Sequence, residues 1–288
     1  MRIPDGLAWL RTSEDGAAWL DSLPSLRQRA MARWSVELGP PFPDAYASLA
    51  MPGTLTDGTE VVVKLAFPHR ESRYEADALR QWDGVGAVRL LDRDADLGAL
   101  VVERCRPGTP LTALDPDRAL DVLLGLLPRL WIPAGEPFVT LADEAAWWAG
   151  YLEDRWRTAG RPFESALLDA ALDTLERLPG SQGELVLVNQ DLHAGNVLRA
   201  QREPWLVIDP KPLAGEREFG VAPVVRGREL GHSRQQVVAR LDRLCGDLGL
   251  DRERARSWTI AQTLAWSFDG TRVLLGHVDV ARWLHEAR

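Results

Sequence analysis

Short apolar runs separated by turn residues fill the front of the chain. These runs cover residues 34–38, 46–50, 61–65, 88–91 and 97–102. Turn residues such as Asp57-Gly58 stand between them, as is typical of neighbouring antiparallel strands. The pattern predicts a five-stranded antiparallel sheet. Before it, residues 1–33 have apolar positions at helical spacing with Pro24 as a break, which predicts short helices packed on the sheet.

Farther along the chain, apolar residues recur every three to four positions, which is the period of a helix with one buried face. The predicted helices cover residues 71–82, 117–127, 141–157, 165–178, 233–248, 252–268 and 278–287. Pro107 and Gly108 lie where the strand pattern gives way to the helical one and mark a lobe boundary. We therefore expect an α+β fold with a strand-rich N-terminal lobe, residues 1–105, and a helical C-terminal lobe, residues 106–288.

The stretch from residue 184 to 212 interrupts the helices with two apolar, β-branched runs. Asp191 follows the first run, Asp209 follows the second, and Asn196 lies five residues beyond Asp191. Phosphoryl transfer needs a base that orients the attacking hydroxyl and hard oxygen ligands that hold Mg²⁺ between phosphates. The arrangement predicts that Asp191 is the base and that Asn196 and Asp209 bind the metal.

Composition strengthens this interpretation. The chain contains only two asparagines, Asn189 and Asn196, and both lie in this stretch. It also contains only two lysines, Lys64 and Lys211, so 34 − 2 = 32 of its basic residues are arginine. An ammonium and a guanidinium are not interchangeable at a phosphate site. Coding bias would also explain why lysine and asparagine are so rare in this chain. The two lysines and two asparagines that it contains nevertheless all fall at candidate site positions.

These residues resemble a known group. Lys64 in VVVKL, the loop QDLHAGN and the segment IDPKP are similar to the aminoglycoside phosphotransferase group of protein-kinase-like enzymes. Within that group the chain resembles the streptomycin 6-phosphotransferase and hydroxyurea kinase family, over residues 34–231. The resemblance implies a protein-kinase-like two-lobed fold, ATP as phosphoryl donor and Mg²⁺. Asn189 stands where the family usually has a histidine that supports the loop, and we expect activity to survive this change.

The resemblance also implies a nucleotide site. Glu75 is expected to pair with Lys64 and hold it toward the α and β phosphates, with Glu71 and a solvent-facing carboxylate as alternatives. The hinge would bind adenine through the carbonyl of Glu103 and the amide of Cys105. His193 would contact a phosphate or make a structural bond rather than transfer a proton.

The loop at residues 39–45 lies where kinases cover the phosphates, but it has no G-x-G-x-x-G, so a plain strand connector is the alternative. The chain also lacks a G-x-x-x-x-G-K-[ST] motif, which argues against a P-loop NTPase. A preference for GTP over ATP stays open, as does the role of Lys211.

The formal net charge is 34 − 42 = −8, which argues against a general nucleic-acid binder. An acidic protein suits a cationic small molecule, although solubility alone would also explain the charge. We expect Glu218 and Asp269 to contact such an acceptor, and most of the 12 tryptophans to pack in the core.

No segment has the apolar length of a signal peptide or a membrane span, so we expect a cytoplasmic monomer without a membrane partner. Cys105 and Cys245 should be buried free thiols, and the histidines lack metal-ligand spacing.

Three functions follow from these observations. The first is an ATP-dependent kinase that inactivates a cationic antibiotic, by resemblance streptomycin at its 6-hydroxyl. The second is a kinase for hydroxyurea or for a small metabolite hydroxyl. The third is a catalytically silent nucleotide-binding module, against which stands the presence of Lys64, Asp191, Asn196 and Asp209 together. A protein kinase is less favoured because the chain has no Ala-Pro-Glu segment.

Overall fold

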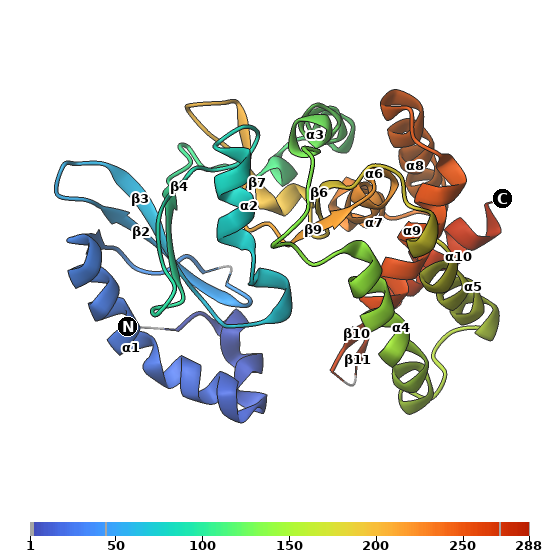
Figure 1. The fold of residues 1–288 in the computed structure, drawn as a ribbon, viewed down its shortest axis with the longest axis horizontal. Helices are drawn as coiled ribbons and strands as arrows, with labels where there is room; N and C mark the ends of the chain where they lie inside the picture. The colour runs from blue at the N-terminus through green and yellow to red at the C-terminus, as the bar shows by residue number, and fades with distance from the viewer. Residues whose placement is uncertain (1–2, 44, 271, 288) are drawn as a thin grey trace. The chain divides into compact units, whose positions relative to one another are not determined.

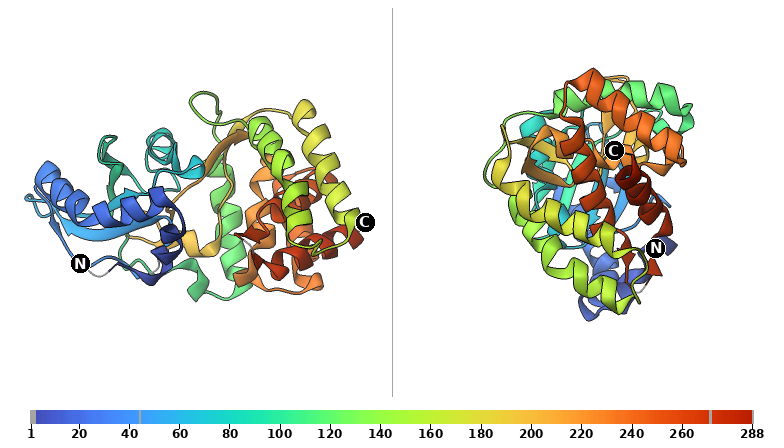
Figure 2. Two further views of the ribbon diagram at one scale, coloured as in Figure 1. Left: turned by 90° about the horizontal axis from the view of Figure 1, so that it is seen from below. Right: turned by 90° about the vertical axis from the view of Figure 1, so that its right-hand side faces the viewer.

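The computed structural model describes residues 3–43, 45–270 and 272–287, and it consists of two compact units (Figures 1 and 2). Unit 1 comprises Met1–Gly108 together with Arg199–Leu206, and unit 2 comprises Thr109–Leu198 together with Val207–Arg288. The chain therefore leaves unit 1 just after the predicted boundary near Cys105. It returns once, for the short segment Arg199–Leu206.

Unit 1 contains a five-stranded sheet with the strand order β1-β2-β3-β5-β4, and all neighbouring strands are antiparallel. Its strands are β1 (Glu37–Leu38), β2 (Ser48–Thr54), β3 (Glu60–Ala66), β4 (Leu90–Asp94) and β5 (Ala99–Glu103). The five predicted strands are confirmed. β3 occupies the centre of the sheet and carries Lys64, which lies opposite Ala50 on β2 and Leu100 on β5.

The two faces of β3 have different surroundings. Val61, Val63 and Leu65 are fully buried in a core that includes residues of the 3-10 helix η1 (Asp5–Thr12) and of α1 (Glu14–Trp34). Because side chains alternate along a strand, Lys64 points to the opposite face. There it meets α2 (Glu75–Trp82), which follows the short turn η2 (Arg70–Ser72) (Figure 1).

Two expectations for the N-terminal region are wrong. Helix α1 is a single 21-residue helix that passes through Pro24, and its last residue is Trp34, which we expected to begin a strand. A proline inside a helix costs about 3 kcal/mol because one hydrogen bond is lost. Burial of Leu20, Leu23 and Ala30 against the sheet offsets this cost.

Unit 2 is mostly helical. Its longer helices are α3 (Pro116–Leu130), α4 (Leu141–Thr158), α5 (Ser165–Arg177), α8 (Arg234–Leu248), α9 (Arg252–Ala265) and α10 (Leu275–Glu286). Shorter elements are η3 (Leu111–Ala113), η4 (Pro179–Ser181), η5 (Ala194–Asn196), α6 (Arg217–Gly220), α7 (Ala222–Arg226) and η6 (Arg228–Leu230). A small hairpin of β10 (Phe268–Asp269) and β11 (Arg272–Val273) occupies the end of the predicted helix 252–268.

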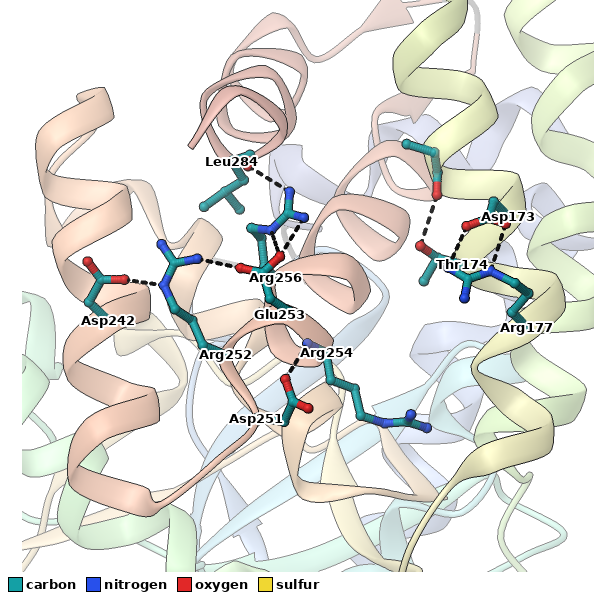
Figure 3. A network of polar contacts seen from close by, with 11 residues as sticks. Asp173, Thr174, Arg177, Asp242, Asp251, Arg252, Glu253, Arg254, Arg256 and Leu284 are labelled. Carbon is teal, nitrogen blue, oxygen red and sulfur yellow. Dashed lines mark hydrogen bonds and ion pairs between the residues drawn. The ribbon is translucent and has the colours of Figure 1, made fainter. Parts of the chain in front are cut away.

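Helix α9 is the central helix of unit 2, because nearly every residue from Trp258 to Ala265 is buried. Polar contacts fix its N-terminal end (Figure 3). The Asp251 carboxylate caps it by accepting from the backbone N–H of Arg254. Arg252 pairs with Asp242 of α8, and Arg256 donates to the Leu284 carbonyl of α10. These contacts join α8 and α10 to α9, the helix that supports the catalytic loop.

The two apolar runs around the catalytic loop form strands but do not pair with each other. β6 (Val186–Asn189) pairs with β9 (Pro212–Gly215), and β7 (Val197–Arg199) pairs with β8 (Trp205–Val207). The loop with Asp191 therefore links one two-stranded sheet to the next, and Asp209 lies on the return path. Among the described residues, no helix is both long and apolar enough to cross a bilayer.

Candidate active site

The catalytic loop begins where β6 ends and is held by its own backbone. The His193 N–H donates to the Asp191 carbonyl at 3.0 Å, and the Asn196 N–H donates to the His193 carbonyl at 2.9 Å. Gly195 permits this tight path, because a Cβ there would lie 2.8 Å from the His193 ring. At the far end, the Ile208 N–H donates to the Asn196 carbonyl at 2.9 Å. Asn196 and the residue before Asp209 are therefore directly joined.

Asn189, where we expected a change from the family's usual histidine, makes hydrogen bonds that support the loop. Its Oδ1 accepts from the backbone N–H of Asp191 and from that of Lys211, each at 3.0 Å. The Gln190 N–H also donates to the Lys211 carbonyl, and the Gln262 amide of α9 donates to the Gln190 carbonyl. One buried side chain thus joins the catalytic segment to the Asp209-Pro210-Lys211 segment.

The side chains of Asn196 and Asp209 offer oxygen ligands. Asn196 Nδ2 donates to the Asp191 carbonyl at 3.3 Å, which leaves Oδ1 as the amide atom suited to a cation. Asp209 has a φ of 51°, in the left-handed region that few non-glycine residues adopt. Such strain commonly persists where a side chain must be aimed at a ligand.

Two cations approach the Asp191 carboxylate. Lys211 Nζ lies 2.9 Å from Oδ2, and Arg226 Nη2 of α7 lies 3.6 Å from Oδ1. The loop amides that this carboxylate could have capped are bonded elsewhere, for instance the Ala194 N–H to Glu229 at 2.9 Å. A carboxylate in such a loop can also serve only to cap nearby backbone N–H groups, and these contacts do not favour that role for Asp191.

Trp266, at the C-terminal end of α9, lies beneath both cations. Lys211 Nζ is 5.1 Å from the centre of its ring and the Arg226 guanidinium carbon is 4.4 Å from it, within the range of cation–π attraction. The His277 ring bonds to the Trp266 carbonyl at 3.0 Å. Burial, helped by the Arg226 charge, lowers the pKa of His277 to about 4, so this histidine is neutral at pH 7.

His193 makes the structural bond that was one of its two expected roles. Its Nδ1 accepts from the Gly195 N–H at 3.1 Å. Because Nδ1 is the acceptor, the proton of the neutral ring resides on Nε2. This Nε2 is the ring atom that remains for a phosphate contact.

In unit 1, Lys64 and Glu75 form a buried pair. Lys64 Nζ lies 2.7 Å and 2.6 Å from the two carboxylate oxygens of Glu75, and the two residues are 7% and 3% exposed. Glu71 belongs to the preceding turn η2, which is why it is Glu75 that faces the lysine. Of the two candidate partners, the structure therefore selects Glu75.

Of the predicted hinge residues, Glu103 ends β5 and is held by a segment that is distant in sequence, whereas Cys105 follows the strand. The Glu103 carboxylate accepts from Arg202 Nη2 at 2.6 Å, while Arg202 also donates to the carbonyls of Gly84 and Ala87. Burial, together with the Glu103 charge, raises the pKa of the Cys105 thiol to about 12, so the thiol stays protonated at neutral pH. The expectation that both cysteines are buried free thiols is confirmed.

The loop expected over the phosphates is bound to β2. The Gly39 N–H donates to the Pro52 carbonyl at 2.8 Å and the Phe42 N–H to the Ala50 carbonyl at 2.9 Å. Asp44 of this loop lies outside the described residues.

Glu218 and Asp269, the two acidic residues expected to contact the acceptor, both belong to unit 2. Glu218 is on α6, and its carboxylate accepts a long 3.4 Å hydrogen bond from the Asp251 N–H at the start of α9. Asp269 is exposed in the hairpin β10–β11, where it pairs with Arg272 in the strand register. Their contact with an acceptor stays a prediction.

Sequence reasoning missed four residues that shape this region, namely Arg202, Arg226, Gln262 and Trp266. Arg202 and Arg226 are two of 32 arginines, and Trp266 is one of 12 tryptophans, so composition does not single them out. The roles of the last three follow only from their contacts in the structure, with the Gln190 carbonyl, the Asp191 carboxylate and the Lys211 ammonium.

Removing the charge of Glu75 should lower the stability of unit 1 and its affinity for ATP. Glu75→Gln removes the carboxylate charge that pairs with the buried Lys64 ammonium, and breaking a buried pair typically costs about 3 kcal/mol or more. We expect a lower free energy of unfolding and a higher KM for ATP. Glu71→Gln is the comparison variant, and because Glu71 belongs to η2 rather than to α2 we expect a smaller effect on both quantities. Urea unfolding and steady-state kinetics provide the test, and equal effects of the two substitutions would contradict the assignment.

Comparison with known proteins decides the family. Residues 33–269 match the profile of the aminoglycoside/hydroxyurea antibiotic resistance kinases. The chain belongs to this family. It is 39% identical to a hydroxyurea phosphotransferase of Kitasatospora aureofaciens, over 98% of this chain and 84% of the relative. It is 37% identical to a streptomycin 6-kinase of Streptomyces glaucescens, over 95% of this chain and 94% of the relative.

The fold agrees with this assignment. Aminoglycoside phosphotransferase APH(4)-Ia in a ternary complex with AMP-PNP and hygromycin B aligns with a TM-score of 0.61 and 18% identity, over 92% of this chain and 95% of that one. The fold is thus protein-kinase-like, as expected. The protein is an ATP-dependent small-molecule kinase that acts on a hydroxyl group.

Proposed function

We propose that this kinase transfers the γ-phosphoryl group of ATP to the 6-hydroxyl of streptomycin and thereby inactivates the antibiotic. The observation that supports this most is the Asp191 loop, whose Asn196 is hydrogen-bonded to the residue before Asp209, in a chain 37% identical to a streptomycin 6-kinase. The net charge of −8 also favours a cationic acceptor.

Asp191 is the general base in this proposal. It accepts the proton of the acceptor hydroxyl while the acceptor oxygen bonds to the γ-phosphorus and the bond from phosphorus to the β,γ-bridging oxygen breaks, which releases ADP. Lys64, held by Glu75, neutralises charge on the α and β phosphates. The Glu103 carbonyl and the Cys105 amide bind adenine, His193 Nε2 contacts a phosphate, and Glu218 and Asp269 meet cationic groups of the acceptor.

The residues present fit a magnesium ion. Among the described residues no three His, Cys, Asp or Glu side chains converge as a metal cage. Mg²⁺ at a kinase site needs only one or two protein oxygens, because phosphates and waters complete its octahedron. Asn196 Oδ1 and the Asp209 carboxylate would supply these oxygens. Bound Mg²⁺ would neutralise charge that develops on the β and γ phosphates.

Hydroxyurea is a second candidate acceptor. The observation that favours it is the 39% identity to a hydroxyurea phosphotransferase. Hydroxyurea is small and uncharged, so it cannot form ion pairs with Glu218 and Asp269, and we expect these residues to contribute less to its recognition than to that of a cation. The two candidates therefore predict different consequences for the same acidic residues.

ADP release measured with ATP, Mg²⁺ and a panel of acceptors tests the proposal. We expect turnover with streptomycin, and thermal stabilisation by streptomycin, because a ligand at 100 times its Kd stabilises the native state by about 2.7 kcal/mol. Turnover with hydroxyurea alone would replace the first acceptor by the second. Binding of ATP without turnover on any acceptor would support a catalytically silent module instead.

A further inference from the structure

We propose that Lys211 is a positioning residue for the phosphoryl transfer, because its ammonium holds the Asp191 carboxylate in the orientation that receives the acceptor proton. This inference rests on the proposed role of Asp191 as the base. The ion pair between Lys211 Nζ and Asp191 Oδ2, at 2.9 Å, is the contact that carries it.

The backbone brings Asp191 and Lys211 close together, because Lys211 lies across from Gln190, the residue before Asp191. In the ladder of β6 and β9, Asn189 lies across from Pro212. One residue farther, the Gln190 N–H donates to the Lys211 carbonyl at 3.0 Å. Asn189 Oδ1 also accepts from the N–H groups of both Asp191 and Lys211. The distance between the two backbones is thereby fixed, and the salt bridge spans a short, defined gap.

The surroundings restrict the motion of both side chains. The Lys211 and Asp191 side chains are 17% and 16% exposed, so solvent screens their attraction only in part. The ring of Trp266 lies under the ammonium at 5.1 Å, and Arg226, 8% exposed, contacts the other carboxylate oxygen. A carboxylate held at both oxygens loses little orientational freedom when the acceptor arrives.

The identity of the cation is informative. This chain uses arginine for 32 of its 34 basic residues, yet a lysine occupies position 211. A compact ammonium can approach one carboxylate oxygen and leave the rest of the group open, whereas the broad guanidinium fork favours bidentate contact with both oxygens. An arginine at position 211 would therefore cover the base that the acceptor must reach.

Kinetics with ATP and streptomycin test this role. In Lys211→Met we expect kcat to fall by about 10²-fold, the loss that follows a small misplacement of a reacting group, while both KM values change by less than about threefold. Lys211→Arg should not restore kcat. Arg177→Met is the matched control, since it removes a cation from an exposed carboxylate pair with Asp173 in the same unit and should leave kcat unchanged.

A double-mutant cycle separates positioning from general support of the fold. If Lys211 acts through Asp191, adding Lys211→Met to Asp191→Asn should cause no further loss of kcat. If the two substitutions lower kcat additively, the inference is overturned. It is also overturned if a lower fraction of folded protein explains the loss of kcat in Lys211→Met. If Asp191→Asn alone keeps the wild-type rate, the proposed base fails. If Asp191→Asn is slow but Lys211→Met keeps the wild-type rate, only the positioning role fails.

A spectroscopic test needs no acceptor. Because the chain has only two lysines, protein labelled with ¹³C-lysine gives two side-chain Cε signals, and Lys211→Met assigns them. Asp191→Asn should shift the Lys211 signal and leave the Lys64 signal in place. An unchanged Lys211 signal would show that the ion pair does not exist in solution and would overturn the inference even if no acceptor were turned over.

Discussion

With Asp191 as the general base, Asp191→Asn should lower kcat by about 10²- to 10⁴-fold, the range that general-base catalysis supplies, while ATP and acceptor should bind nearly as tightly as in the wild type. The amide keeps the shape of the side chain but has neither the charge nor the basicity of a carboxylate. The effect is confined to the rate because the base acts mainly in the transition state. The backbone of the loop should persist, since Asn189 rather than the Asp191 carboxylate accepts the Asp191 N–H.

Calorimetric titration with nucleotide and streptomycin, beside the melting temperature, checks this result. Asp173→Asn is the matched control, because Asp173 also pairs with a cation in unit 2 but lies on the exposed face of α5. A fall of several degrees in melting temperature together with the loss of both affinities would mean that Asp191 is structural.

Asp209→Asn should give the second large effect. In the proposed site, loss of the carboxylate charge would remove a ligand for Mg²⁺. A metal contributes several kcal/mol of charge stabilisation, and about 1.4 kcal/mol is tenfold in rate. We expect kcat to fall by about 10²-fold or more and to need higher Mg²⁺, while nucleotide affinity without metal stays near the wild-type value.

Asparagine is the appropriate replacement because Asp209 has a φ of 51° and asparagine tolerates the left-handed region. Asp83→Asn is the control, since Asp83 has a φ of 44° at the end of α2 and is exposed. Rates measured over a range of Mg²⁺ concentrations distinguish the two. Wild-type turnover in Asp209→Asn at low Mg²⁺ would remove Asp209 from the metal site.

The sheet and the helices of unit 2 were predictable because each follows from a local period. The apolar run at residues 61–65 predicted a strand that carries Lys64, and β3 (Glu60–Ala66) is that strand. Apolar periods likewise predicted α4 and α5 nearly to their ends. Residues that favour turns, such as Asp57-Gly58, separated these elements in the sequence.

Where local rules compete with tertiary packing, the sequence misleads. Pro24 favours a helix break, but the buried face of α1 continues through it, and Trp34 therefore ends a helix instead of starting a strand. β6 pairs with β9, although the residues of β9, Pro212–Gly215, have little strand propensity. Neither outcome can be read from the period of nearby residues.

The candidate site residues likewise divide into those that the sequence predicted and those whose role depends on tertiary packing. The sequence singled out Asn196 and Lys64 because asparagine and lysine are rare in this chain, and Asp191 and Asp209 because each follows an apolar run. The function of Asn189 was not predictable, because it depends on two backbone N–H groups 20 residues apart that one side chain joins, those of Asp191 and Lys211. The cation pair over Trp266 depends on the end of α9 packing beneath the loop.

The most direct test of the proposed function is the position of the phosphate on the product. Streptomycin incubated with the protein, ATP and Mg²⁺ should yield a phosphomonoester whose ³¹P–¹H coupling by nuclear magnetic resonance identifies the 6-hydroxyl as the single site. A relative named as a streptomycin 3''-kinase is 29% identical to this chain, so regiochemistry distinguishes the two kinds of enzyme. Phosphate on any other hydroxyl, or recovery of unmodified streptomycin while hydroxyurea is phosphorylated, would contradict the proposal.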